Sequence, residues 1–183
     1  PLSRLIELGY LARDLPFGAP ARGGKRTVYR IADPLLRFWY RFVEPNRSRL
    51  EAGQLAQVRA DVQRSWSQHL GPAWEVLARQ SVARRPIAGH SWQPAQRWWS
   101  RKDEIDIVAT SASDSARVLV GEVKLRCTAR EVGPLLADLA RRAHDCPALA
   151  GKKLTCALWV LRYGSRARPD HLLTATDVIE AMR

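Results

Sequence analysis

The sequence predicts an α/β fold in which helices flank a mixed sheet. From Trp66 onward, the apolar patterns follow the order helix, strand, strand, strand, helix, strand, strand, helix. Helices with one apolar face and strands with buried faces pack as a sheet covered by helices. At 183 residues the chain is long enough for one large core with a small appended module. We expect three parts: residues 1–33, a helical connector at 34–65, and the sheet domain at 66–183.

The N-terminal part contains a helix, a strand, a basic Gly-rich tip and a second strand. PLSRLIELG is amphipathic, and Gly9 stands where a helix typically ends. YLARDLPF and KRTVYRIAD have strand patterns, and Arg22, Lys25 and Arg26 in the tip are candidate contacts to nucleic-acid phosphates. This order resembles the last helix and the wing of a winged-helix DNA-binding fold without its two preceding helices. Because the chain also begins at Pro1, we expect a fragment of a longer protein, with removal of Met before Pro as the alternative.

The connector begins at Asp33–Pro34, because Asp is a good N-cap acceptor and Pro fits the first turn of a helix. The following PLLRFWYRFVEP is apolar on most faces, which indicates a helix at a junction between modules. NRSRLEAGQ is expected to be a polar connector. Two helical patterns follow, across roughly Leu55 to Ser65 and Trp66 to Ala83.

The remaining elements complete the sheet domain. An irregular strand is expected around Ile87 to Trp92, and core packing is a better explanation of the tandem Trp98–Trp99 than base stacking. Thr128 and Glu131 have the spacing of a capping box at the start of a helix. KLTCALWVLRYG predicts a buried strand, and HLLTATDVIEAMR predicts a short strand followed by a capped helix.

A charged hairpin, EIDIVATSASDSARVLVGEVKL at residues 104–125, carries the candidate site. Side chains alternate between the two faces of a strand, so Glu122 and Lys124 share a face. If the strands pair antiparallel about a turn centred near Asp114, Asp106 lies opposite Glu122, with Cβ atoms about 4.5–5.5 Å apart. Two carboxylates at this spacing repel each other unless a cation lies between them.

The residue types around this cation position suit the hydrolysis of a phosphodiester. Mg²⁺, or Mn²⁺ in its place, prefers oxygen ligands and is often held by one or two carboxylates and a substrate phosphate. Asp106 and Glu122 are therefore candidate metal ligands. The Lys124 ammonium would orient the attacking water and offset charge on the phosphate. The alternative is a solvent-exposed Glu-x-Lys pair with an unrelated Asp upstream.

The composition favours some partners and excludes several kinds of site. Lys and Arg total 30 against 18 Asp and Glu, a net charge of +12, which favours a nucleic-acid partner; an Arg-rich genome is the alternative. Cys127, Cys146 and Cys156 form no CxxC pair, so we expect a reduced cytoplasmic protein without a zinc site. GAPARGGKRT departs from the phosphate-loop pattern of ATPases, and no apolar run approaches the roughly 20 residues of a membrane span, so no membrane partner is expected.

The Asp and Glu-x-Lys pattern resembles the PD-(D/E)XK, or restriction-endonuclease-like, superfamily. More closely, LIELGYLARDLPFG, YRIADPLLRFWYRFVEPNRSRLEAG, RWWSRKDEIDIVA and VGEVKL are similar to the C-terminal domain of archaeal-type AAA-family ATPases. The resemblance implies an αβββαβ core and a Mg²⁺- or Mn²⁺-dependent deoxyribonuclease with Asp106, Glu122 and Lys124 at the signature positions. Ile105 replaces the proline of the motif, and Glu75 matches an auxiliary acidic metal ligand on the first core helix. The resemblance also implies an ATPase module in the same full-length chain.

Three functions are therefore compatible with the sequence. The first is a metal-dependent DNA nuclease domain. The second is a non-catalytic DNA-binding or coupling module of an ATPase, and the third is a protein-interaction domain in which the hairpin charges form a structural ion pair.

Overall fold

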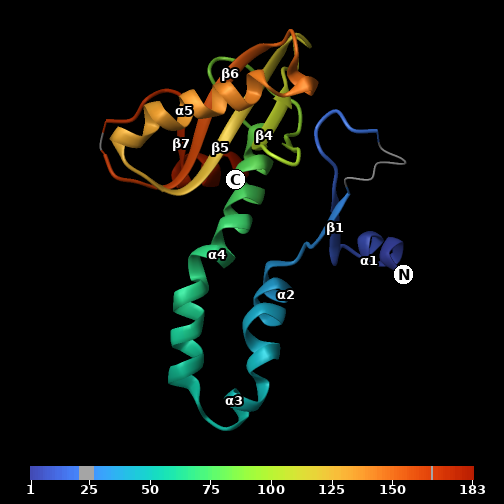
Figure 1. Ribbon diagram of the computed structural model, residues 1–183, viewed down its shortest axis with the longest axis vertical. Helices are drawn as coiled ribbons and strands as arrows, with labels where there is room; N and C mark the ends of the chain where they lie inside the picture. Colours follow the sequence, from blue (N-terminus) through green and yellow to red (C-terminus); the bar gives the residue numbers. More distant parts are fainter. Residues whose placement is uncertain (21–26, 166) are drawn as a thin grey trace. The chain divides into compact units, whose positions relative to one another are not determined.

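The computed structural model describes residues 1–20, 27–165 and 167–183 (Figure 1). Arg22, Lys25 and Arg26, the candidate phosphate contacts of the tip, lie outside the described residues. The chain forms two compact units: Pro1–Asp14 with Thr27–Ala73, and Trp74–Arg183 with residues 15–20. The division into parts at 1–33, 34–65 and 66–183 stays a prediction.

The first unit opens with a helix and a two-stranded hairpin. Helix α1 spans Leu2–Glu7, and Gly9 follows it with φ of +75°, the left-handed conformation that glycine adopts without strain. Strand β1 (Leu11–Asp14) pairs antiparallel with β2 (Val28–Ile31). The expected order of helix, strand and strand is present, and its assignment to a winged helix stays a prediction.

Short helical segments follow the hairpin. Helix α2 spans Pro34–Phe38, and the Asp33 carboxylate accepts a hydrogen bond from the Leu36 N–H at 2.9 Å, as the capping pattern predicts. The chain continues helically through three further segments: η1 (Trp39–Val43, π-helical), η2 (Glu44–Asn46, 3₁₀) and α3 (Arg47–Glu51). NRSRLEAGQ, the expected polar connector, is helical over Arg47–Glu51, the residues of α3.

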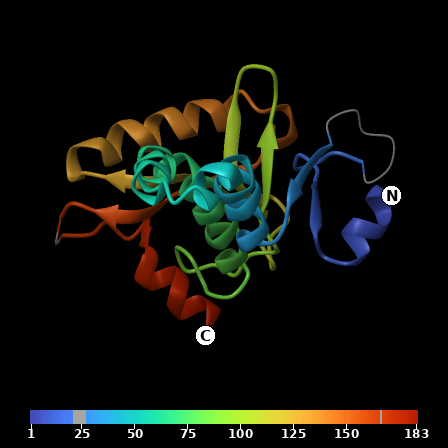
Figure 2. The ribbon, with the colours of Figure 1, turned by 90° about the horizontal axis from the view of Figure 1, so that it is seen from below.

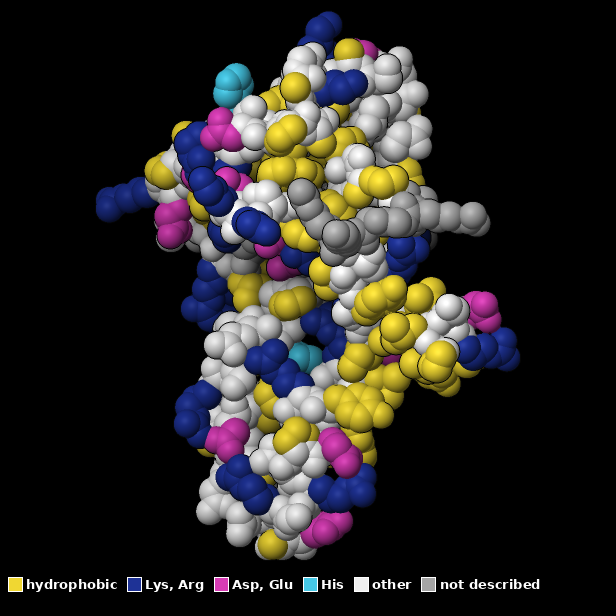
Figure 3. All heavy atoms as spheres, turned by 45° about the vertical axis from the view of Figure 1, so that its right-hand side comes forward, with side chains coloured by type: hydrophobic (Ala, Val, Ile, Leu, Met, Phe, Trp, Pro, Cys, Tyr) yellow, Lys and Arg dark blue, Asp and Glu magenta, His cyan; other side chains and the backbone are white. Residues whose placement is uncertain are grey.

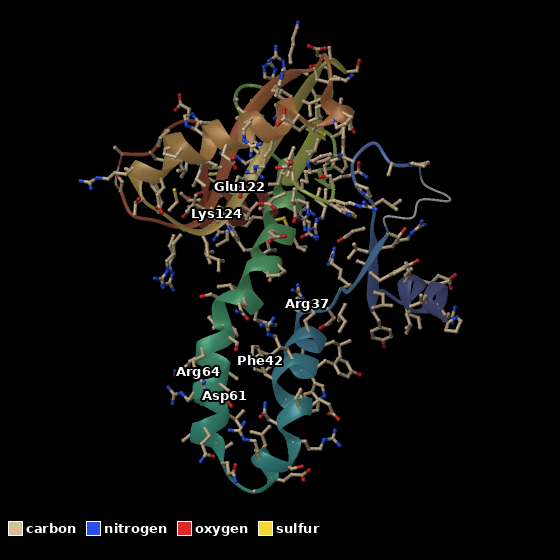
Figure 4. The ribbon with its side chains drawn as sticks, in the orientation of Figure 1. Arg37, Phe42, Asp61, Arg64, Glu122 and Lys124 are labelled. Atoms are coloured by element: carbon tan, nitrogen blue, oxygen red, sulfur yellow. The ribbon has the colours of Figure 1, made fainter. Side chains whose placement is uncertain are left out.

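Helix α4 (Leu55–Val82) is continuous, whereas the sequence suggested two helices. Pro72 lies inside it, and a single proline removes one backbone hydrogen bond without ending a helix whose other turns are held by packing. In the first unit, the Phe42 ring lies 5.2 Å from the His69 ring, and Asp61 pairs with Arg49 at 2.8 Å and with Arg64 (Figure 4). These contacts fix the first half of α4 against the preceding helices.

Hydrophobic side chains remain exposed in the first unit. Figure 3 shows them gathered over α1 and the β1–β2 hairpin. The exposed set there comprises Leu2, Leu5, Leu8, Tyr10, Val28 and Tyr29. Despite this apolar surface, none of the helices in the described parts of the chain has the length and apolar character that crossing a bilayer requires.

The second unit is a five-stranded mixed sheet flanked by helices, which confirms the predicted α/β class. Its strands are β3 (Gln96–Trp99), β4 (Glu104–Thr110), β5 (Arg117–Cys127), β6 (Lys153–Tyr163) and β7 (Leu172–Thr174), adjacent in that order. The pairs β3–β4 and β4–β5 are antiparallel, and β5–β6 and β6–β7 are parallel. The helical elements that follow β5 are α5 (Ala129–His144), η3 (Pro147–Leu149) and α6 (Ala175–Met182).

The first strand lies later in the chain than the sequence suggested. Residues 87–92 form only isolated bridges, Ile87 with His90 and Trp92 with Ser111. Ala88 and Gly89 both have positive φ, so the chain turns back on itself there instead of extending. The strand is β3, and its Trp98 is 7% exposed within the core, which confirms the packing role expected for that residue.

Two apolar layers cover the sheet. The end of α4 and α6 pack on one face, with Trp74, Ala78 and Val178 in the same cluster as Trp159 of β6. Helix α5 packs on the other face through Leu139 and further apolar residues. Figure 2 shows α5 and α6 on opposite sides of the sheet. The start of α5 has the predicted capping box, in which the Thr128 N–H donates to Glu131 Oε2 at 2.7 Å.

Candidate functional site

The candidate site lies where β4 and β5 stop pairing. Their register runs from Thr110 with Val118 to Ile107 with Gly121, which is the register expected from a turn centred at residue 114. Asp106 and Glu122 are the residues that directly follow this last pair on the two strands. The side chains of Glu122 and Lys124 lie next to each other on β5 (Figure 4).

Strand β4 carries a bulge between Ile105 and Val108, in the stretch that contains Asp106. In the pairing with β3, Gln96 is the partner of Val108, whereas Trp98 is the partner of Ile105, so β4 contains one extra residue between them. Consistent with this, Ile105 and Val108 share one core cluster although they are three positions apart, an odd offset that would place them on opposite faces of a regular strand. A bulge redirects the side chain at its centre and locally ends strand pairing.

Side chains replace the backbone partners that this bulge removes. The Val123 N–H donates to Asp106 Oδ2 at 2.8 Å, and the Asp106 carbonyl accepts from Arg79 Nη1 at 3.0 Å. Asp106 is thereby fixed between β5 and helix α4. Because Oδ2 is engaged in this hydrogen bond, Oδ1 is the oxygen best suited to a further ligand.

Two cations hold the Glu122 carboxylate, whose residue is only 7% exposed. Lys124 Nζ lies 2.5 Å from Oε1, and Arg142 Nη2 lies 2.6 Å from Oε2. The Arg142 side chain is 12% exposed and also binds Asp138 at 2.8 Å and the Glu104 carbonyl, whereas the Lys124 side chain is 40% exposed. Arg142 is therefore fixed in place, and Lys124 is the partner that can move.

Sequence reasoning missed Arg142. It lies three residues after Leu139, which is fully buried, and directly before the buried Ala143. An arginine on the apolar stripe of an amphipathic helix needs a buried acidic partner, and Glu122 is the acid that faces it. That position on the stripe was the available signal.

Glu75 adds a third acidic group from helix α4. Its carboxylate lies 3.8 Å from Arg79. Burial raises the pKa of Glu75, and the charges of Glu104 and Glu122 raise it further, while Arg79 and Arg97 oppose the rise. The negative charge of Glu122 therefore disfavours ionisation of Glu75.

Burial and a neighbouring carboxylate set the electrostatics of Asp106. Burial raises the pKa of Asp106 to about 7, the charge of Glu122 adds to the rise, and the hydrogen bond from Val123 opposes it. A cation near both carboxylates would relieve this repulsion.

Replacing Asp106 with asparagine is expected to remove a pH-dependent cost of folding. Between pH 4 and pH 7 the unfolded chain loses a proton that the folded chain keeps, so wild-type stability falls as pH rises and levels off above pH 7. Relative to Asp106→Asn, the wild type should lose about 3–4 kcal/mol of unfolding free energy between pH 4 and pH 8. Urea unfolding of both proteins in EDTA measures the difference in unfolding free energy. If that difference does not change with pH, the pKa of Asp106 is not raised in the folded protein.

The donor set fits a hard divalent cation. Asp106, Glu122 and Glu75 offer only oxygen ligands, which suit Mg²⁺ or Mn²⁺. As the side chains stand, no group of three or more His, Cys, Asp or Glu residues among those described is arranged to hold a metal ion. The salt bridges of Glu122 explain this, since a cation can reach Oε1 only after the Lys124 ammonium leaves it.

Comparison with known proteins places the chain in a family. A family model, DUF234, described as archaeal and bacterial proteins of unknown function, matches residues 39–133, just over half of the chain. The chain belongs to the DUF234 family. The part matched by the DUF234 model includes Glu75, Asp106, Glu122 and Lys124.

A relative from Methanocaldococcus jannaschii extends the similarity over most of the chain. This uncharacterised protein is 28% identical over 148 residues, which cover 78% of the chain and 32% of the relative. The chain thus spans about a third of that relative's length. No solved structure matches the chain.

Proposed function

We propose that this chain is a Mg²⁺- or Mn²⁺-dependent DNA nuclease domain built on a PD-(D/E)XK core. The observation that carries the proposal is the position of Asp106 and Glu122 directly after the last pair of β4 and β5, with the Lys124 amine 2.5 Å from Glu122 Oε1. The element order α4, β3, β4, β5, α5, β6 agrees with the αβββαβ order of that superfamily. The matched DUF234 region contains all the residues that would do the chemistry.

Each side chain has a distinct role in this proposal. Asp106 and Glu122 would hold the metal ion, with Glu75 as an auxiliary ligand from α4. A bound Mg²⁺ would supply Lewis-acid stabilisation of the phosphate and a more acidic water. The Lys124 ammonium, once it leaves Glu122, would orient the attacking water and offset charge on the phosphate. Arg142 would keep Glu122 in place throughout, because it is buried and bound to Asp138 as well.

Cleavage of plasmid DNA tests this proposal. The wild type should cut DNA with Mg²⁺ or Mn²⁺ and not in EDTA. Lys124→Gln should slow cleavage by about 100-fold or more, the usual effect of removing a group that stabilises transition-state charge. Lys152→Gln is the matched control, because that exposed lysine precedes β6 and donates to the Ser115 carbonyl, away from Glu122.

The nuclease proposal fails if the wild type, Lys124→Gln and Lys152→Gln all nick DNA at the same background rate with each metal, because the site is then not catalytic.

A second candidate function is a non-catalytic nucleic-acid-binding or coupling module. The observation that favours it is that Arg142 and Lys124 already neutralise both oxygens of Glu122, so the site is internally balanced without a metal. The tip residues Arg22, Lys25 and Arg26 would then bind phosphates. From the resemblance, we propose an ATPase module as the partner in the full-length chain. Salt-sensitive DNA binding with no cleavage under any divalent metal would favour this function.

A further inference from the structure

Three arginines lie in the segments where β5 and β6 end and α5 begins. Arg126 and Arg162 are register partners at the C-terminal ends of these parallel strands, and Arg130 lies in the first turn of α5. All three are exposed. The Gly164 N–H donates to the Cys127 carbonyl at 3.0 Å and keeps the two strand ends together.

These positions are electrostatically unfavourable for arginine in the free protein. Like charges on directly neighbouring strand positions destabilise a sheet, and a cation at a helix N-terminus opposes the helix dipole. Across the described part of the chain, Arg126, Arg130 and Arg162 form no salt bridge. An external anion bound near them would offset both costs.

We propose that Arg126, Arg130 and Arg162, the arginine tract, bind the sugar–phosphate backbone of a nucleic acid as it passes the candidate site. The proposal rests on the proposed function, because it extends the same site. Glu122, Lys124 and Arg126 occupy alternate positions of β5, so the row from Glu122 to Arg126 is about 13 Å long. Nucleic acid held by the tract would thus lie within reach of Lys124.

The chemistry of the tract favours nucleic acid over an acidic peptide or a lipid surface. Guanidinium groups bind phosphate through two parallel hydrogen bonds. A DNA strand presents a phosphate about every 3.4 Å along the duplex axis, so neighbouring arginines can each contact one. The tract also continues the row that contains the proposed catalytic lysine, where a phosphodiester has to be placed.

The opposite ends of the same two strands provide a matched control. Arg117 and Lys153 are register partners there, about 30 Å from Arg126 and Arg162 along the strands. Lys152 directly precedes Lys153 in the sequence. Arg117 lies 4.0 Å from Asp114, and Lys152 donates to the Ser115 carbonyl. Replacing these three residues removes the same net charge at a distance from the site.

The experiment compares Arg126→Gln/Arg130→Gln/Arg162→Gln with Arg117→Gln/Lys152→Gln/Lys153→Gln. Binding of the 183-residue chain to a fluorescein-labelled DNA duplex is measured by anisotropy in EDTA over a series of NaCl concentrations. The tract variant should bind at least about 10-fold more weakly, and its slope of log affinity against log salt should be shallower by about 2–3. The control variant should stay within about twofold of the wild type and keep its slope. Equal losses in both variants, or no loss in either, would overturn the proposal.

Three further measurements distinguish DNA binding by the tract from misfolding, from binding of another anion and from the nuclease activity. Arg126→Lys/Arg162→Lys keeps the charges and should keep the wild-type dependence of DNA affinity on salt, which checks that the triple variant does not lose affinity by misfolding. If this variant has the wild-type melting temperature but a shallower salt dependence, the result counts against the tract. Tract-dependent binding of anionic vesicles or of an acidic peptide, with DNA binding unaffected, would also overturn it. Binding is measured in EDTA, which prevents cleavage, so the two proposals can fail separately. Binding that depends on the tract, without cleavage in Mg²⁺, would support the tract and contradict the nuclease. Cleavage by all variants with equal DNA affinity would support the nuclease and contradict the tract.

Discussion

Replacing Gly121 with alanine should lower the free energy of unfolding by about 3 kcal/mol, as expected when atoms are forced into a well-packed core. A Cβ at this position would lie 2.5 Å from Trp159 Cζ3 and 2.9 Å from Ile107 Cβ. Trp159 and Ile107 are both fully buried, so neither can move aside without disturbing the sheet. Urea unfolding measures the effect.

Gly164→Ala is the control for this change. Its Cβ would come no closer than 3.8 Å to the surrounding atoms, an ordinary contact distance, so the substitution should change stability by less than about 1 kcal/mol. If Gly121→Ala is as stable as the wild type, the close packing of Trp159 on β5 is wrong. Gly121 directly precedes Glu122, so this packing also sets where β5 presents the site.

Replacing Glu122 with alanine is expected to cost about 3–5 kcal/mol of stability, because it removes the buried carboxylate that pairs with Arg142 and leaves this cation with the half-exposed Asp138. Lys124→Met removes the other salt bridge of Glu122 and should cost no more than about 1 kcal/mol, since the Lys124 side chain is 40% exposed. The difference between the two variants measures which cation holds Glu122. Equal costs would contradict the fixed role assigned to Arg142.

A double variant separates the fold from the chemistry. Glu122→Leu/Arg142→Met replaces the buried pair with apolar groups of similar size and should recover most of the stability lost in Glu122→Ala. It should nevertheless remain inactive on DNA under the proposed function, because the metal ligand is gone. A folded double variant that cleaves DNA at the wild-type rate would exclude Glu122 from catalysis.

Local patterns were enough to predict most of the sheet unit. The alternation in residues 104–125 predicted the register of β4 and β5, because a turn centred at Asp114 fixes every pair that follows. The Asp33 cap and the Thr128–Glu131 capping box were equally local and both are present. In each case the determining interactions lie within a few residues or within one hairpin.

Features that depend on distant partners were missed. The bulge in β4 follows from the pairing of this strand with β3, and the position of β3 itself depends on the turn at Ala88 and Gly89. The fixed position of Glu122 depends on Arg142, twenty residues away on another element. The sequence pattern of β4 and β5 contains no sign of the bulge or of the Arg142 salt bridge. The electrostatics of the site could therefore not be predicted from the hairpin alone.

The most direct test of the proposed metal site is a crystal of this chain soaked in Mn²⁺ and measured for anomalous scattering. We expect a single strong peak bound by Asp106 and Glu122, with the Lys124 ammonium moved off Glu122 Oε1. A site without a peak at saturating Mn²⁺, with Lys124 and Arg142 both still on Glu122, would contradict the proposal.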